Sequence, residues 1–281
     1  MDSCFQVGTF PFRLCVPDGL ILPDNLRKFA AADSAYRYVF RCVEEVAPPE
    51  GKPLLRRSTL TVWASHFGET RLLSLPGRQG KALYREQSER EAEIFLTPDW
   101  LSMLQYDTVL TSLLALERRL IGLDGLVLHC AYLRHLGEAI LFSAPSETGK
   151  STQAGLWEQY RGGETINGDR ALLQKLDGCW TARGWPVCGS SGICRNEDTP
   201  IRAIVMLSQA LENRVDRLHP AQAFALLYGQ ITVNRWNRAA TARAVDLIED
   251  LIGTVPVFHL GCTISEEAVD CLDAALSAGT A

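Results

Sequence analysis

A Gly-Lys-Ser tripeptide between an apolar segment and a helix-like segment is the strongest chemical signal in the chain. Residues 139–152 read Ala-Ile-Leu-Phe-Ser-Ala-Pro-Ser-Glu-Thr-Gly-Lys-Ser-Thr. The order of strand, tight turn, Gly-Lys-Ser and helix is typical of a phosphate-binding loop (P-loop), in which backbone N–H groups and a helix N-terminus surround a phosphate. Lys150 is then expected to bind the β- and γ-phosphates of ATP, and Ser151 to bind the accompanying Mg²⁺.

The remaining loop residues complete the predicted nucleotide site. They are Ser146, Glu147, Thr148, Gly149 and Thr152. Two positions depart from the usual Gly-x-x-x-x-Gly-Lys-Ser spacing, because Ala144 stands at the first glycine and Glu147 places a carboxylate in the loop. A carboxylate there repels phosphate unless it points to solvent, which is the orientation we expect. The alternative is that Glu147 marks a weakened affinity for nucleotide.

Phosphoryl transfer also needs a carboxylate that holds Mg²⁺ or accepts a proton from the acceptor. The nearest candidate downstream of the loop is Asp169, in the sequence Asn-Gly-Asp-Arg just before an apolar segment. We predict that Asp169 is both a metal ligand and a catalytic residue. The alternative is an ordinary turn residue at the end of a strand.

The order of these parts resembles the HPr serine kinase/phosphorylase family, which shares a P-loop fold with phosphoenolpyruvate carboxykinases. In that family a His-bearing strand, a hairpin and a second strand lead into Gly-x-Ser-Gly-x-Gly-Lys-Ser, and an Asp-Asp-Arg segment follows. The corresponding segments here are 129–134, Ser146 with 149–151, and 168–170. The match covers about residues 126–175 well, and it looks closer to the shorter bacterial kinases of this superfamily, some of which accompany peptide-maturation clusters.

The resemblance implies an α/β fold with a P-loop kinase domain of the HPr kinase/phosphoenolpyruvate carboxykinase type, preceded by a smaller β-rich domain. It makes Lys150 a phosphate ligand and Ser151 a magnesium ligand. Asp169 matches the second Asp of the family pair, and His129 matches a histidine close to the site. His129 would orient Asp169 or the acceptor hydroxyl; its alternative is a hydrogen-bonded core residue. Because the first Asp of the pair is Gly168 here, we expect phosphorylation without the reverse phosphorylase activity.

Arginines and a flexible-looking segment surround the acidic residue in the sequence. Arg170, Arg183 and Arg195 are candidates for neutralising the transferred phosphoryl group, with Arg170 the best placed. Residues 184–192 are rich in Gly and Ser, which suits a mobile loop that recognises or covers the substrate. An ordinary connecting loop is the alternative.

Strands and helices that position these residues are predicted from periodicity and turn signals. In the second part of the chain, we expect strands over 126–133, 139–143, 171–176, 201–207 and 255–260, and helices over 150–160, 220–229, 240–252 and after Thr263. The first hundred residues alternate as strands with short helices, and one helix is expected over 107–121. We therefore predict a β-rich domain of unknown role at 1–106 and a P-loop phosphotransferase domain at 107–281.

Composition narrows the class of protein. The 281 residues are 47% hydrophobic and carry a formal net charge of −5, which suits a folded chain and not a nucleic-acid partner. Apolar runs fall short of the roughly 20 residues that a membrane span needs, and the N-terminus lacks the features of a signal peptide. Nine scattered cysteines without a Cys-x-x-Cys pair predict reduced thiols in the cytoplasm. Cys188 and Cys194 lie close in sequence, but we expect no zinc site.

These observations together predict an ATP- and Mg²⁺-dependent enzyme, an HPr kinase-like serine kinase that phosphorylates a serine of a protein or peptide. Two alternatives stay open. One is a small-molecule kinase of the same fold, and the other is a non-catalytic nucleotide-binding regulatory module, which the departures at Ala144, Glu147 and Gly168 favour. The sequence leaves open whether the chain forms a homo-oligomer.

Overall fold

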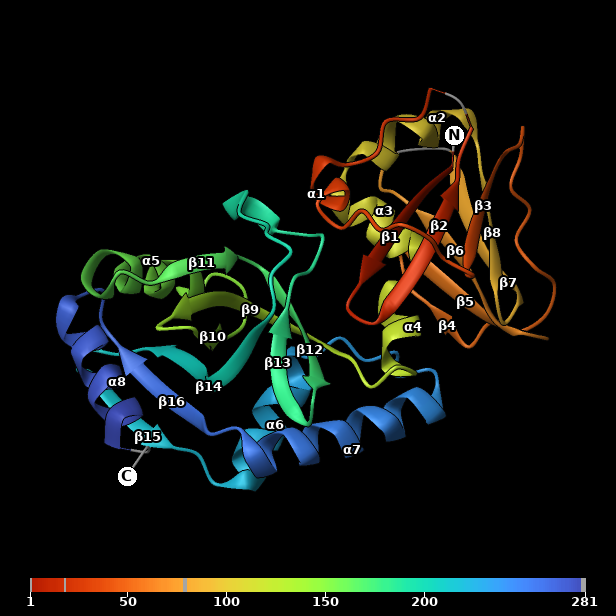
Figure 1. Ribbon diagram of the computed structural model, residues 1–281. Helices are drawn as coiled ribbons and strands as arrows, with labels where there is room; N and C mark the ends of the chain where they lie inside the picture. Colours follow the sequence, from red (N-terminus) through yellow and green to blue (C-terminus); the bar gives the residue numbers. More distant parts are fainter. Residues whose placement is uncertain (1, 18, 78–79, 279–281) are drawn as a thin grey trace. The chain divides into compact units, whose positions relative to one another are not determined.

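The computed structural model describes residues 2–17, 19–77 and 80–278, and the chain divides into two compact units, Met1–Arg119 and Leu120–Ala281 (Figure 1). The predicted mixture of helices and strands is confirmed, with one large sheet in each unit. The division falls after Arg119 and not at the predicted 106/107, because α3 (Asp107–Leu114) packs against β7 of the first unit. None of the helices in the described ranges combines the length and apolar composition needed to cross a membrane.

The first unit is built on an eight-stranded mixed sheet with the order β1-β2-β3-β8-β7-β6-β5-β4. Its strands are β1 Asp2–Val7, β2 Phe10–Cys15, β3 Arg37–Cys42, β4 Leu55–Arg56, β5 Leu60–Ser65, β6 Gly68–Ser74, β7 Lys81–Ser88 and β8 Glu91–Leu96. Its helices are α1 Asp24–Arg27, α2 Pro98–Leu101, the 3-10 turn Ser102–Gln105, and α3, followed by α4 Leu116–Ile121 at the boundary. Alternating burial along β2, where Phe10, Phe12 and Leu14 face the core, explains why these residues form a half-buried strand.

The single helix predicted over 107–121 is wrong. Ala115 adopts a left-handed conformation with φ 51°, which ends α3 and separates it from α4. Four consecutive residues, Leu113 to Leu116, are all buried. One straight helix cannot turn four successive side chains toward a single core, because they cover most of its circumference. The break at Ala115 lets both helices bury their apolar residues.

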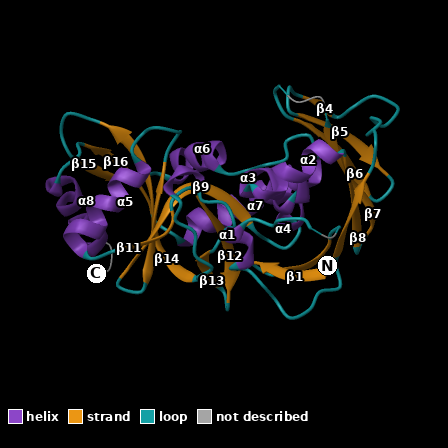
Figure 2. Ribbon diagram, turned by 90° about the horizontal axis from the view of Figure 1, so that it is seen from above, coloured by secondary structure: helices purple, strands orange, loops and turns teal. Residues whose placement is uncertain are grey.

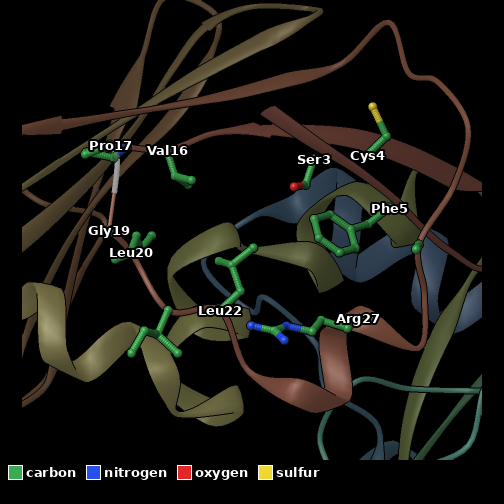
Figure 3. Close-up of a pocket in the computed structure, with 11 residues that line it drawn as sticks. Ser3, Cys4, Phe5, Val16, Pro17, Gly19, Leu20, Leu22 and Arg27 are labelled. Atoms are coloured by element: carbon green, nitrogen blue, oxygen red, sulfur yellow. The ribbon is translucent and has the colours of Figure 1, made fainter. Parts of the chain in front are cut away.

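An apolar cavity of about 580 Å³ lies in the first unit, between β1 and the segment that follows β2 (Figure 3). It is lined by Ser3, Cys4, Phe5, Val16, Pro17, Gly19, Leu20, Ile21, Leu22, Arg27 and Ala30. None of these residues belongs to the predicted nucleotide site, so the cavity and the P-loop are separate features on different units.

The second unit contains the predicted P-loop, residues 144–149, and its own sheet, with the order β10-β9-β12-β13-β14-β16-β15 and β11 beside β9. Its strands are β9 Leu126–His135, β10 Glu138–Ser143, β11 Glu164–Asn167, β12 Arg170–Leu176, β13 Cys179–Arg183, β14 Thr199–Gln209, β15 Arg214–Arg217 and β16 Val257–Cys262. Its helices are α5 Lys150–Arg161, α6 Pro220–Gln230, α7 Arg238–Thr254 and α8 Glu266–Ala278, with a 3-10 turn at Gly189–Ser191. Because β14 pairs with both β13 and β10, the strands β10, β9, β12, β13 and β14 form a closed ring.

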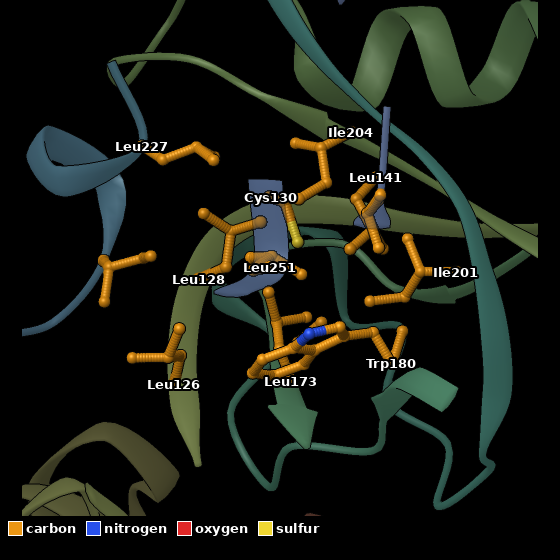
Figure 4. Close-up of a cluster of buried hydrophobic side chains, with 14 of the residues drawn as sticks. Leu126, Leu128, Cys130, Leu141, Leu173, Trp180, Ile201, Ile204, Leu227 and Leu251 are labelled. Atoms are coloured by element: carbon orange, nitrogen blue, oxygen red, sulfur yellow. The ribbon is translucent and has the colours of Figure 1, made fainter. Parts of the chain in front are cut away.

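Two apolar clusters hold helices on the opposite faces of this sheet (Figure 2). The residues of β9 are divided between the two clusters. Leu128 and Cys130 belong to the cluster under α6 and α7. Ala131 and Leu133 belong to the cluster under α5 and α8, on the other face of the strand. The larger cluster brings together side chains from β9, β10, β12, β13 and β14, around Trp180 (Figure 4). Both faces of the strand that leads into the P-loop are therefore buried and rigidly placed.

Three strands of this sheet run parallel and end at the same edge. β10 pairs in parallel with β14, and β14 pairs in parallel with β16. The loops that follow them are 144–149, 210–213 and 263–265. In α/β sheets, ligands bind beyond the carboxyl ends of parallel strands, so this edge is the expected place for a ligand.

Candidate phosphate-binding site

The predicted P-loop connects the end of β10 to the start of α5, so the predicted order of strand, loop and helix is confirmed. Glu147 and Gly149 both have positive φ, 66° and 110°, within the turn. Backbone of this kind forms concave N–H arrangements that bind anions, and the first turn of a helix adds further N–H groups without intrahelical partners. The Glu147 side chain is exposed, in agreement with the expectation that it points to solvent.

Lys150 lies across this turn. Its Nζ donates to the carbonyl oxygens of Ala144 and Pro145, both at 3.1 Å, and only 8% of the residue is exposed. An ammonium group has three N–H donors, so two are used by the loop and one is left for a phosphate oxygen. Burial lowers the pKa of Lys150, and the nearby carboxylate of Asp169 opposes this effect. Lys150 and Asp169 are therefore electrostatically coupled in the folded chain.

Strand β9 places Asp169 at the level of the P-loop. On one edge of β9, Cys130 pairs with Ser143, the last residue before the loop. On the other edge, the backbone N–H of Cys130 donates to the carbonyl oxygen of Asp169 at 3.0 Å. Cys130 of β9 thus lies between the predicted P-loop and the turn that carries Asp169, residues 167–170, which is called the acidic turn below. Helix α5 and strand β11 separate the two along the chain.

His129, the preceding residue of β9, lies beside the acidic residue. Its Nε2 is 3.6 Å from Oδ1 of Asp169, and its side chain also forms a hydrogen bond with Gln230. Burial lowers the pKa of His129, the positive charges of Lys150 and Arg170 act in the same direction, and Asp169 opposes them. The lowered pKa favours the neutral imidazole, which is the form that can accept a proton.

Arg170 is held between Asp169 and Thr232, a residue that no sequence pattern indicated. Its Nε donates to Oδ2 of Asp169 at 3.1 Å, and its Nη1 donates to Oγ1 of Thr232 at 3.2 Å. Thr232 and Gln230 come from the end of α6, and the chain there runs beside β9, with Ile231 bridging to Leu128. No local signal marks these two residues, because only the tertiary pairing with β9 brings them to the site.

Asn167 fixes the turn that presents Asp169. Its Oδ1 accepts hydrogen bonds from the backbone N–H groups of Asp169 and Arg170, at 2.9 and 3.0 Å. Its Nδ2 donates to the carbonyl oxygens of Trp185 and Val187, at 2.9 and 3.0 Å. The side chain is fully buried, so it ties the acidic turn to the Gly/Ser-rich segment. An Asn two residues before an Asp in a turn is the sequence signal that could have pointed to this role.

The segment 184–192 packs onto the acidic turn and is not a free loop. Trp185, Val187 and Cys188 are buried, and Cys194 bridges to Asn167. The 3-10 turn Gly189–Ser191 lies against the acidic turn, since a Cβ on Gly189 would be 3.1 Å from Cγ of Asp169. This segment forms one wall of the candidate site.

Two of the candidate arginines are used elsewhere. The guanidinium of Arg183 pairs with Asp198 at 2.9 Å, and that of Arg195 pairs with Glu164. Only Arg170 of the three has a described contact with Asp169. Arg170 is therefore the candidate arginine that lies beside Asp169, and its role in charge neutralisation stays a prediction.

The residues present suit a magnesium ion that arrives with a nucleotide. Within the described ranges, no group of three or more His, Cys, Asp or Glu side chains is arranged to hold a metal by itself. Mg²⁺ bound with phosphates needs only one or two protein ligands, because phosphate oxygens and water supply the rest. The exposed Ser151 in the first turn of α5 and the partly exposed carboxylate of Asp169 offer hard oxygen donors of the required kind.

Comparison with known proteins finds distant structural likenesses but no match in sequence. No model of a known protein family matches the sequence, and no curated protein matches it. Among solved structures, the HPr(Ser) kinase/phosphatase from Coxiella burnetii is similar at 11% sequence identity, over 55% of this chain and 94% of that one, with a TM-score of 0.32. A likeness this weak gives no indication of activity.

Proposed function

We propose that the chain is an ATP- and Mg²⁺-dependent phosphotransferase that phosphorylates a hydroxyl group, with a serine of a protein or peptide as the acceptor. One observation supports the proposal. The predicted P-loop and Asp169 lie on the two edges of β9 at the same level, and His129 lies beside Asp169. A triphosphate held by the loop would then have a carboxylate and a neutral imidazole at its reactive end.

The phosphate-binding part of the proposal assigns Lys150 and the backbone N–H groups of the loop to the β- and γ-phosphates. The predicted residues Ser146, Glu147, Thr148, Gly149 and Thr152 would contribute loop backbone, and the Glu147 carboxylate would stay in solvent. Ser151 and Asp169 would hold Mg²⁺, which neutralises charge on the phosphate oxygens when bound.

The transfer step uses the residues around Asp169. A bond forms between the acceptor oxygen and the γ-phosphorus, while the bond from that phosphorus to the bridging oxygen of ADP breaks. The acceptor proton passes to Asp169, with His129 orienting the carboxylate or the hydroxyl. Arg170, whose guanidinium is held by Asp169 and Thr232, would offset negative charge on the transferred group. Positioning and electrostatic stabilisation supply most of the rate enhancement in such reactions.

A non-catalytic nucleotide-binding module is the second candidate. The observation that favours it is that the acidic turn carries one carboxylate, and that Ser191 fills the space beside Gly168. A single carboxylate would have to serve both the metal and the acceptor proton. The module would bind nucleotide through the same loop and would transfer nothing.

The test follows labelled phosphate from γ-labelled ATP with Mg²⁺, in a dialysed lysate of the organism that encodes the chain. Wild type is compared with Asp169→Asn and with Asp177→Asn, a matched change at the exposed turn at the far end of β12. Label on a protein or peptide with wild type and Asp177→Asn, but not with Asp169→Asn, is the expected result.

The other outcomes separate the alternatives. Label that appears only on a small molecule, in undialysed extract, would replace the serine acceptor with a small-molecule acceptor. No transfer in either extract, with intact nucleotide binding, would favour the regulatory module. Equal transfer by Asp169→Asn and wild type would contradict the assigned role of Asp169.

A further inference from the structure

Two large aliphatic side chains are exposed on neighbouring loops at the carboxyl edge of the parallel strands. Leu211, in the loop after β14, is 98% exposed, and Ile264, in the loop after β16, is 77% exposed. Single exposed aliphatic residues are common on protein surfaces, but these two lie on loops that are bonded to each other.

Hydrogen bonds join the two loops into one unit. The backbone N–H of Ala210 donates to the carbonyl oxygen of Cys262 at 3.1 Å. Oδ1 of Asn213 accepts from the backbone N–H of Thr263 at 2.8 Å and from its hydroxyl at 3.2 Å. The loops 210–213 and 263–265, which carry Leu211 and Ile264, are therefore bonded into one unit, called the platform below.

The platform is also bonded to the helix that follows the P-loop. Gln153, a buried residue in the first turn of α5, donates from Nε2 to the carbonyl oxygen of Thr263 at 3.2 Å. Gln153 lies three positions after Lys150 along the helix. The platform thus lies next to the N-terminus that the phosphate site uses.

The order of strands decides which end of a nucleotide this platform would meet. Asp169 and Arg170 lie beyond β9, on one side of β10, whereas β14 and β16 follow on the other side. A triphosphate with its γ-phosphate at Asp169 and its β-phosphate in the loop would have its nucleoside directed away from Asp169. The loops after β14 and β16 are the next ones along that edge.

We propose that Leu211 and Ile264 bind the base of the nucleotide, packing their aliphatic side chains against its ring. The inference rests on the proposed function, because it takes the P-loop to hold the phosphates of a nucleotide. A nucleobase has apolar faces and polar edges, so an aliphatic surface beside an anion site recognises a nucleotide and discriminates against a bare polyphosphate. This specificity would come from Leu211 and Ile264, and not from the loop itself.

The test compares the affinities for ATP and for inorganic tripolyphosphate, each with Mg²⁺, by calorimetry on the full chain. The variant is Leu211→Ser combined with Ile264→Ser, and the control is Leu136→Ser. Leu136 is an equally prominent aliphatic residue, 81% exposed, but it lies in the hairpin at the opposite end of β10. We expect the double variant to bind ATP roughly tenfold more weakly, because it loses apolar contact area. Its affinity for tripolyphosphate should be unchanged, and the control should bind both ligands as wild type does.

Tripolyphosphate binding by the double variant also reports that the variant is folded. An unchanged affinity for ATP in the double variant would overturn the base contact and leave the P-loop assignment intact. Equal affinity of wild type for ATP and tripolyphosphate would overturn it as well. A wild-type chain that binds neither ligand would overturn the proposed function, and the base contact with it.

Discussion

Ser191 occupies the space that any side chain at position 168 would need. A Cβ on Gly168 would lie 2.2 Å from Oγ of Ser191 and 2.4 Å from its Cβ. The Ser191 hydroxyl is itself fixed, since Oγ donates to the carbonyl oxygen of Cys188 at 2.7 Å and accepts from the backbone N–H of Ile193 at 3.2 Å. The glycine in the acidic turn and the serine in the opposing wall are therefore a matched pair.

This match predicts the effect of Gly168→Ala. The added methyl group should displace the Gly189–Ser191 turn and destabilise the chain by about 1–3 kcal/mol, the usual cost of overpacking. Ser191→Gly removes both atoms that clash, so the double variant Gly168→Ala/Ser191→Gly should recover most of that loss. Urea unfolding of the four members of the cycle measures the coupling. Additive effects of the two substitutions would show that the contact does not constrain the turn.

Substitutions should separate the role of Lys150 in nucleotide binding from the role of Asp169 in phosphoryl transfer. Lys150→Ala removes the charge that spans the loop and should abolish the increase in melting temperature that MgATP produces by binding the folded state. Asp169→Asn keeps the loop intact, so it should retain nucleotide binding and lose phosphoryl transfer. Lys175→Ala is the control, because Lys175 pairs with Asp250 on the exposed surface of β12 and has no part in the loop. Thermal stabilisation by MgATP in Lys150→Ala would contradict the phosphate assignment.

Glu147 combines a left-handed backbone with an exposed carboxylate. Gly accepts φ 66° without strain but has more freedom in the unfolded chain, so Glu147→Gly should change the free energy of unfolding by less than about 1 kcal/mol. Removing the negative charge should strengthen MgATP binding by a few fold at low salt, with a smaller gain at high salt because exposed charges are screened. Calorimetry at two ionic strengths checks both expectations. Weaker binding or slower transfer would mean that the carboxylate takes part in the site.

The lowered pKa of His129 predicts a pH dependence of stability. Above its ordinary value of 6.5 the imidazole is neutral in both states, and its contribution to stability is fully present. As the pH falls below that value, the unfolded chain binds the proton first, so stability decreases until the lower folded pKa is passed. His129→Gln should flatten this part of the curve below about pH 7. Burial also lowers the pKa of His135, so a residual slope should remain. An unchanged slope in His129→Gln would refute the prediction.

A buried ion pair network should control the stability of the first unit. Arg71 is buried on β6 and pairs with Glu69 and, at 2.6 Å, with Glu117. Arg71→Ala would remove the buried partner of Glu117 and Glu69, although Arg118 stays 3.7 Å from Glu69, and should destabilise the unit by about 3–5 kcal/mol. Arg85→Ala, at an exposed position of β7, should cost less than about 1 kcal/mol. Equal costs for the two substitutions, measured by urea unfolding, would contradict this account.

Local signals in the sequence determined much of the second unit. The strand, loop and helix around Lys150 were predicted within a few residues, as were most strands and helices up to the C-terminus, because alternating burial and turn residues act over short distances. The first unit was less predictable. The helix predicted over 107–121 is two helices in the structure, because burial against distant segments decided where it breaks at Ala115.

The phosphate-binding loop is a prediction from the sequence alone, since glycine, lysine and serine at this spacing between a strand and a helix are typical of such a loop. Their relation to the acidic turn is a property of the tertiary structure. Only the pairing of β9 with β10 on one edge, and with β11 and β12 on the other, brings Lys150 and Asp169 together. The roles of Asn167, Thr232 and Gln230 likewise arise from hydrogen bonds between segments distant in the chain, which composition and periodicity do not encode.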